Sequence, residues 1–174
     1  MNSIERRVSS WRWLGLSALV VLADQTSKAY IARHFGEFEV TRVLPILEIT
    51  RMQNVGAAFS LLASASGWQR WFFIALALGV SLAIVNWLVR PRANPGVLLP
   101  AGLACILGGA VGNLIDRARL GYVVDFLDLY WRNHHWPTFN VADVGITVGV
   151  VLLMIDMAFS PKEPGDASRP AAGR

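Results

Sequence analysis

Two aspartates, Asp125 and Asp143, have the residue type and placement in this sequence that best suit hydrolytic chemistry. Two carboxyl groups that lie close together cannot both ionise at low cost, so the pKa of one rises and the pair shares a proton. The ionised member then accepts a proton from water while the protonated member donates to a carbonyl oxygen. Such a pair lets water attack a peptide carbonyl without a covalent intermediate. Asp125 and Asp143 are therefore a candidate catalytic dyad.

Two pairs of polar residues occur at helical spacing. Asp24 and Lys28 are four residues apart, as are Asn113 and Arg117, so each pair shares one face of a helix. Each residue also has an ordinary structural explanation, which stays open. Asp24 and Lys28 can pair simply to make both charges tolerable in lipid, Asn113 can hydrogen-bond to a neighbouring helix, and Arg117 can anchor a helix at the interface.

Two further asparagines add amide groups to this set. Asn140 is a good N-cap residue, and Asp143 three positions later suits the positive end of the helix dipole. Asn54, followed by Gly56, lies in a polar connection between two apolar segments. Capping alone would explain Asn140, but no single structural role explains the whole set.

Other hydrolytic chemistries lack their motifs. The histidines are His34, His134 and His135, and the sequence contains no H-E-x-x-H zinc-protease motif and no G-x-S-x-G. The only cysteine, Cys105, cannot form an intrachain disulfide and lies in an apolar run, where it behaves as a small hydrophobe. We expect no metal and no cofactor.

The composition indicates a membrane protein. The 174 residues are 54% hydrophobic and only 16% charged, whereas charged residues make up about a quarter of an ordinary soluble domain. The net charge is +4, but the basic residues flank apolar segments instead of forming a block or stripe, which favours membrane anchoring and argues against nucleic acid.

Four segments have the roughly 20 apolar residues that a spanning helix needs, at about 13–32, 71–89, 97–115 and 141–159. Glycine pairs spaced four residues apart, Gly108 with Gly112 and Gly145 with Gly149, predict that the helices pack closely, although glycine is also common in membrane helices without that role. We expect an all-α integral membrane protein with a single four-helix domain over residues 1–160 and a disordered cytoplasmic tail over 161–174.

Two connections are expected outside the membrane on the same side. Residues 35–68 are rich in β-branched residues and predict a hairpin or small sheet, with an apolar stretch at 57–65 that can lie on the bilayer surface. Residues 118–140 contain a strand-like piece followed by a turn. The expected fold therefore includes a small extracytoplasmic β-rich region.

Arginines are densest at the N-terminal flank and in the connection between the second and third spans, which predicts that both termini are cytoplasmic. This topology places the polar residues listed above at one depth near the outer face, whereas Asp156 falls at an inner helix end. A buried charge costs roughly 2.5–3.5 kcal/mol on insertion scales, so their common depth predicts a functional site assembled from several segments.

Five short motifs in this chain resemble those of bacterial lipoprotein signal peptidases, also called signal peptidase II. They are D-Q-T-S-K at 24–28, N-V-G-A-A-F at 54–59, G-G-A-V-G-N-L-I-D-R at 108–117, V-V-D-F at 123–126 and F-N-V-A-D at 139–143. Each motif is weak alone, but the five in this order and spacing are specific, and the likeness runs from Asp24 to about Ile146.

The resemblance implies an aspartic endopeptidase of the bacterial inner membrane with catalytic Asp125 and Asp143. Such an enzyme removes the signal peptide from prolipoproteins, cutting just before a cysteine that carries a diacylglyceryl group. The resemblance also implies supporting roles for Asp24, Lys28, Asn54, Gly56, Asn113, Arg117 and Asn140. The expected partners are lipid-modified prolipoprotein signal peptides and membrane lipid, and we expect a monomer.

Two other classes of protein fit parts of the sequence. In a small transporter, Asp24, Lys28 and Asp143 would relay protons or ions, but a carrier needs polar groups through the membrane's depth or inverted repeats. A scaffold protein would use the glycine faces to bind partner helices, and would leave Asp125 and Asp143 without a purpose.

Overall fold

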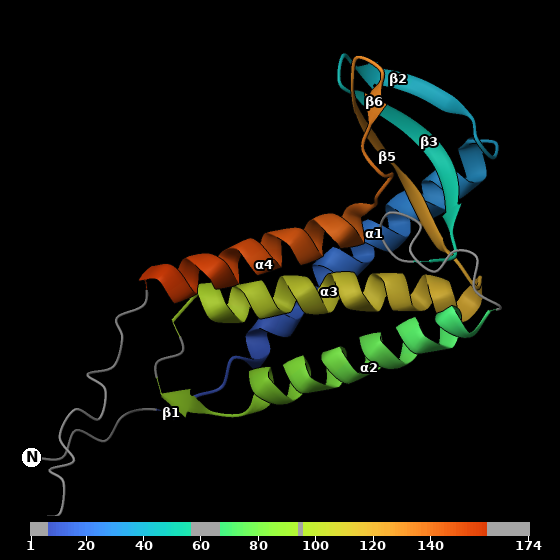
Figure 1. The fold of residues 1–174 in the computed structure, drawn as a ribbon. Coiled ribbons are helices and arrows are strands. Elements are labelled where there is room, and N and C mark those ends of the chain that lie inside the picture. Colours follow the sequence, from blue (N-terminus) through green and yellow to red (C-terminus); the bar gives the residue numbers. More distant parts are fainter. Residues whose placement is uncertain (1–6, 57–66, 94–95, 160–174) are drawn as a thin grey trace, which may run out of the picture.

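The computed structural model describes residues 7–56, 67–93 and 96–159. Its long helices form a bundle with a small sheet at one end (Figure 1). The helices are α1 (Leu14–His34), α2 (Trp68–Val89), α3 (Leu98–Arg119) and α4 (Val141–Phe159), with a short 3-10 turn at Trp11–Trp13 before α1. The predicted stretch at 57–65 and the predicted tail at 161–174 lie outside the described residues.

The helix α3 is the centre of the bundle. Of its most apolar stretch, 56% of the residues are buried inside the protein, against 17% in α2 and in α4. In Figure 1, α3 runs between α2 and α4. The lipid-like faces of α2 and α4 therefore point outward, while α3 makes most of its contacts with other helices.

Among the described helices, α2, α3 and α4 are long and apolar enough to cross a membrane. The sequence predicts a fourth span at 13–32, which corresponds to α1. Asp24, Gln25 and Lys28 lower the hydropathy of this helix, and the membrane crossing of α1 stays a prediction. The other three predicted spans match their helices to within four residues at each end.

Glycines let the helices approach closely, as the sequence predicts. A Cβ atom on Gly109 would lie 2.2 Å from the carbonyl oxygen of Ala142, and one on Gly149 would lie 2.5 Å from the carbonyl oxygen of Gly102. A Cβ on Gly108 would lie 2.6 Å from Val20 of α1. Both predicted glycine pairs thus serve packing, with Gly108 and Gly112 mainly against α1 and Gly149 against α3. The shortest approach of α3 to α4 is at Gly109, which lies outside both pairs.

The sheet is antiparallel and has the strand order β2-β3-β5-β6. Its strands are β2 (Val40–Leu44), β3 (Leu47–Asn54), β5 (Val123–Trp131) and β6 (His134–His135). The predicted hairpin in 35–68 and the predicted strand after residue 118 are confirmed, because β2 and β3 form the hairpin and β5 pairs with β3. The connections at 35–68 and 118–140 therefore contribute strands to a single sheet.

The pairing of β3 with β5 sets the position of Asp125. Met52 lies opposite Asp125, and the register shifts between Ile49 and Met52, which marks a β-bulge in β3. At the other end of the bundle, β1 (Arg7–Val8) pairs with β4 (Arg92–Ala93), far from the four-stranded sheet (Figure 1).

Candidate active site

Asp125 lies in β5 at the junction of the sheet with the helices, and is only 1% exposed. Two side-chain amides hold its carboxylate. Asn54, at the end of β3, donates from Nδ2 to Oδ2 at 2.9 Å, and Asn140 donates from Nδ2 to Oδ1 at 2.6 Å. Each carboxylate oxygen therefore has its own amide donor, which fixes the plane of the group.

Asp143 lies in the first turn of α4. Asn113 of α3 donates from Nδ2 to its Oδ1 at 2.8 Å. Asn140 and Asp143 also cap each other: the Asp143 N–H donates to Asn140 Oδ1 at 3.0 Å, and the Asn140 N–H donates to Asp143 Oδ2 at 3.2 Å. This reciprocal pair is the capping arrangement that satisfies two free N–H groups at a helix start, and the predicted N-cap at Asn140 is confirmed.

The two aspartates belong to one hydrogen-bonded network. Asn140 donates to Asp125 and also to Asn113 Oδ1 at 3.2 Å, while Asn113 donates to Asp143. Both aspartates line a single cavity of about 850 Å³. Two carboxyl groups from separate elements, with fixed orientations, therefore face the same space.

Burial raises the pKa of Asp125 to about 6, from an ordinary value of 3.8. The hydrogen bond from Asn54 opposes this increase, and the negative charge of Asp143 adds to it. A carboxyl group with this pKa exchanges its proton near neutral pH, which is what an acid–base catalyst needs.

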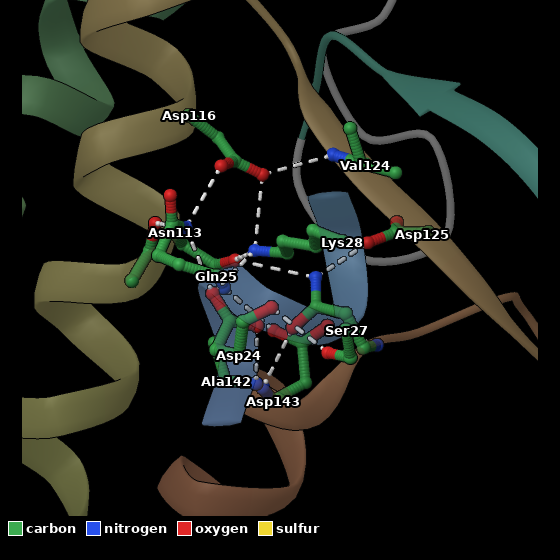
Figure 2. Close-up of polar contacts among 12 residues, drawn as sticks. Asp24, Gln25, Ser27, Lys28, Asn113, Asp116, Val124, Asp125, Ala142 and Asp143 are labelled. Atoms are coloured by element: carbon green, nitrogen blue, oxygen red, sulfur yellow. Dashed lines mark hydrogen bonds and ion pairs between the residues drawn. The ribbon is translucent and has the colours of Figure 1, made fainter. Parts of the chain in front are cut away.

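A buried charge cluster lies beside the dyad (Figure 2). Lys28 forms ion pairs with Asp24 Oδ2 at 2.9 Å and with Asp116 Oδ2 at 3.0 Å, and donates to Asn113 Oδ1 at 2.9 Å. All four side chains are buried. The predicted pair of Asp24 with Lys28 is therefore present, but it is part of a larger cluster that ends on Asn113, the residue that holds Asp143.

Asp24 also reaches the start of α4. Its Oδ1 accepts the N–H of Ala142 at 2.9 Å, an N–H that the helix itself leaves unpaired. The carboxylate thus ties α1 to the helix turn that carries Asp143 (Figure 2). A Cβ on Gly112 would lie 2.6 Å from Asp24 Oδ2, so glycine is required at that position for this contact.

Asp116 and Gln25 complete the cluster, and neither was assigned a role from the sequence. Asp116 Oδ2 accepts the N–H of Val124 at 3.1 Å, which fastens β5 to α3 next to Asp125. Gln25 donates to Asp116 Oδ1 at 3.0 Å and to Asp24 Oδ2 at 3.1 Å. The sequence does contain a signal for Asp116: it lies three residues after Asn113, and residues at that spacing are neighbours on a helix.

Arg117 and Gly56 meet at the edge of the site. Arg117 donates to the carbonyl oxygen of Gly56 at 3.1 Å, and its guanidinium lies 4.9 Å from the ring centre of Phe73. The Gly56 N–H donates to Asn54 Oδ1 at 3.0 Å. Arg117 therefore supports, through the backbone at Gly56, the asparagine that holds Asp125.

The cavity is polar at the aspartates and mostly apolar along its walls, which also carry Asp128 and His135. The polar end has Asn54, Asn113 and Arg117 next to the dyad. The apolar residues come from β3 and the residue after it, β5, the loop before α4 and the first half of α4, and include Met52, Val55, Leu129, Phe139, Val144 and Val148. A space of this kind suits a ligand with a polar group at one end and hydrocarbon along the rest.

All nine residues that the sequence singled out as site candidates lie in this region. They come from α1, β3 and the residues after it, α3, β5 and the start of α4. Their convergence at one end of the bundle agrees with the predicted common depth. The assembled groups can hold one carboxylate protonated and one ionised beside a water-accessible space, which is the requirement for activating water.

Solved structures show the same architecture. The chain is similar to a structure described as a bacterial membrane enzyme determined by the in meso method at 2.3 Å resolution, with a TM-score of 0.77, 28% identity and coverage of 92% of this chain and 98% of that one. A second structure of the same description, at 1.9 Å resolution, gives a TM-score of 0.76 with 27% identity over 91% of this chain and all of that one.

The chain belongs to the signal peptidase II family, because the sequence profile described as signal peptidase (SPase) II matches residues 16–159. The lipoprotein signal peptidase of Acinetobacter baumannii is 51% identical over 151 residues, covering 87% of this chain and 85% of the relative. That of Shewanella amazonensis is 47% identical over 148 residues, covering 85% and 88%. The family is one of peptidases, and the predicted family membership is confirmed.

Proposed function

We propose that this protein is an aspartic endopeptidase that removes the signal peptide from diacylglyceryl-modified prolipoproteins, cutting before the lipid-modified cysteine. The observation that carries the proposal is the dyad itself: Asp125 and Asp143 come from different elements, are joined through Asn140 and Asn113, and line one cavity. The names of the relatives supply the substrate class, since they are lipoprotein signal peptidases.

The proposed reaction uses one shared proton. A water molecule between the two carboxyl groups gives a proton to the ionised aspartate and attacks the scissile carbonyl carbon, while the protonated aspartate donates to the carbonyl oxygen. The tetrahedral intermediate then collapses as a proton passes to the leaving amine. The pKa of Asp125, at about 6, suits a group that holds a proton in one step and releases it in the next.

The supporting residues position the dyad in this proposal. Asn54 and Asn140 orient the Asp125 carboxylate, and Asn113 orients that of Asp143. Lys28 supplies the positive charge beside Asn113 that offsets the negative charge of the site. These contacts are worth most in a site that excludes bulk water, because electrostatic interactions strengthen as the dielectric falls.

The substrate's lipid is proposed to lie along the apolar walls of the cavity. Val144 and Val148 of α4 line this space on the helix that also carries Asp143. Acyl chains held there, with their glyceryl ester groups toward Arg117 and Asn54, would leave the peptide bond before the modified cysteine at the dyad. This arrangement makes the lipid a positioning device that sets which bond is cut.

The proposed membrane arrangement has four spans: α1 crosses the membrane in addition to α2, α3 and α4. Both termini lie in the cytoplasm, residues 1–160 form a single domain, and the site lies near the outer face of the bacterial inner membrane. The basic residues at the described inner end, Arg12, Arg90 and Arg92, support this orientation. The enzyme is proposed to act as a monomer, because all nine site residues come from one chain.

The test is to express Asp125→Asn and Asp143→Asn separately in bacteria depleted of their own lipoprotein signal peptidase. Each variant should reach the membrane at the normal level, yet processing of a diacylglyceryl-modified precursor should stop. Asp156→Asn is the matched control, because Asp156 lies near the opposite end of α4, and it should process normally. Full processing by either dyad variant would rule out the assignment.

A further inference from the structure

A second cluster of ligand-type side chains lies in the sheet and takes no part in the proposed reaction. Glu48 of β3, Asp128 of β5 and His135 of β6 each offer one donor atom, and these atoms all lie within 4.8 Å of one another. Glu48 and Asp128 are directly opposite each other in the β3–β5 register. Three adjacent strands therefore bring one imidazole and two carboxylates to one point.

The cluster is shielded from water on one side and open on the other. The side chains of Glu48 and Asp128 are 11% and 14% exposed, while that of His135 is 51% exposed. Asp128 Oδ2 lies 2.9 Å from His135 Nδ1. Asp128 Oδ1 is buried and has no hydrogen-bond partner among the residues that the structure describes. A buried carboxylate oxygen without a partner is costly and calls for an explanation, such as an ion.

We propose that Glu48, Asp128 and His135 form a binding site for a divalent transition-metal ion of the zinc class. Zinc binds imidazole nitrogen and carboxylate oxygen, with three protein ligands and water at the fourth position in open sites. Magnesium and calcium prefer all-oxygen ligand sets, so the imidazole selects against them. The exposed edge of His135 provides the entry path, and a bound metal ion gives the unpartnered Asp128 Oδ1 a positive partner.

One donor pair already lies near the spacing that zinc requires, and the third donor lies within 4.8 Å of both. Two ligands at 2.0–2.1 Å in a tetrahedral site lie roughly 3.3 Å apart, so the 2.9 Å between His135 and Asp128 has to open by only a few tenths of an ångström. Glu48 is held by Arg42, whose Nη2 lies 3.2 Å from Oε1. The Arg42 side chain is 69% exposed and can move into water, so it does not block the metal.

A metal ion bound at this site would hold three strands together at the wall of the catalytic cavity. Asp128 and His135 line the same cavity as Asp125 and Asp143. The strand β6 has only two residues, paired to β5 through Tyr130 and Trp131. A metal bound to His135, Asp128 and Glu48 would fix β6 and the start of the loop that leads to α4 against β5 and β3. The inference stands independently of the dyad, because it requires only the sheet.

The test is a Zn²⁺ titration of the purified full-length protein in detergent, with any affinity tag removed, followed by calorimetry and by thermal unfolding. The wild-type protein should bind one equivalent and unfold at a higher temperature as Zn²⁺ increases. His135→Ala should weaken binding at least about tenfold, because even outer partners of metal ligands are worth 10- to 100-fold. Asp128→Asn should weaken it similarly.

His134→Ala is the matched control, since His134 is the exposed neighbour in the same strand and is not in the cluster. It should bind Zn²⁺ as the wild type does, and His34→Ala should do the same. Absence of one-equivalent binding to the wild type would overturn the proposal. So would equal losses in His134→Ala and His135→Ala, which would indicate nonspecific binding to exposed histidines. Unfolding without Zn²⁺ shows that each variant is folded.

Discussion

The amide of Asn140 donates to Asp125 at 2.6 Å, although the two residues lie in different elements. Asn140 precedes α4, and Asp125 lies in β5. The oxygen of the same side chain caps the N–H of Asp143. One asparagine therefore sets both the orientation of one candidate catalytic carboxylate and the start of the helix that carries the other.

These two roles can be separated by substitution. Asn140→Ser keeps an oxygen that caps the helix but loses the amide that reaches Asp125, so we expect normal membrane levels and a decrease in kcat of roughly 100-fold, the scale of a small misplacement at a reacting centre. Asn140→Ala loses both roles, so it should also lower the free energy of unfolding by about 1 kcal/mol. Membrane levels, unfolding temperature and processing rate are the measurements. Normal kcat in Asn140→Ser would show that Asn140 is only a cap.

Asp116 connects the charge cluster to the strand that carries Asp125. Its Oδ2 accepts from both Lys28 and the Val124 N–H. Asp116→Ala leaves the buried Val124 N–H unpaired and removes one partner of Lys28, which keeps Asp24 and Asn113, so we expect a loss of about 1–3 kcal/mol in unfolding free energy. At temperatures where the variant is folded, kcat should fall more than KM rises, because Asp125 shifts with β5.

Asp116→Asn is the milder comparison, since it keeps an acceptor for the Val124 N–H and loses the charge and the acceptor for Gln25. It should be more stable than Asp116→Ala and retain more activity. Unfolding temperatures for Asp116→Ala and the wild type that agree within error would contradict the assigned contact.

Local sequence spacing was enough to predict one part of the site. The i,i+4 pair of Asp24 with Lys28 and the cap formed by Asn140 depend only on helix geometry, and both are present. The two glycine pairs likewise predict close helix packing, because small residues at that spacing always share a face. Such features can be inferred from a few consecutive residues.

The rest of the site depends on contacts between distant segments. The bond from Asp116 to Val124 requires the orientation of β5 against α3, and the place of Asp125 requires the bulge between Ile49 and Met52. Neither the contact between Asp116 and Val124 nor the bulge in β3 can be predicted from the spacing of residues in the sequence. The sequence therefore predicts which residues gather at one end of the bundle, while the structure reveals which of them touch.

Gly109 is expected to tolerate no side chain. A Cβ there would lie 2.2 Å from the carbonyl oxygen of Ala142, a backbone atom that cannot rotate away. Gly109→Ala should therefore push the first turn of α4 from α3, destabilise the protein by about 1–3 kcal/mol or more, and displace Asp143. Gly79→Ala in α2 is the matched control, because nothing lies within 4 Å of its added Cβ.

Unfolding temperature and processing rate should both fall in Gly109→Ala and stay near the wild-type values in Gly79→Ala. Equal behaviour of the two variants would show that the approach of α3 to α4 is looser than the structure indicates. A fall in unfolding temperature with full activity would show that Asp143 keeps its place without this contact.

The raised pKa of Asp125 predicts how stability depends on pH. The folded state holds the Asp125 proton up to about pH 6, whereas an unfolded chain releases it near 3.8. Between these values the folded state binds more protons, so Asp125 makes the protein progressively less stable as pH rises, and the full penalty is present above pH 6. Two pKa units correspond to about 3 kcal/mol, which is an upper estimate for the group.

Asp125→Asn removes this titration, so the variant should gain stability relative to the wild type as pH rises from 4 to 7. The hydrogen bond lost with one carboxylate oxygen adds an offset that does not change with pH, and the slope alone is diagnostic. Thermal unfolding of both proteins in detergent across this range measures it, with Asp156→Asn as the control that should follow the wild type. Parallel curves for Asp125→Asn and the wild type would mean that Asp125 titrates at its ordinary value and that burial at the dyad does not hold its proton.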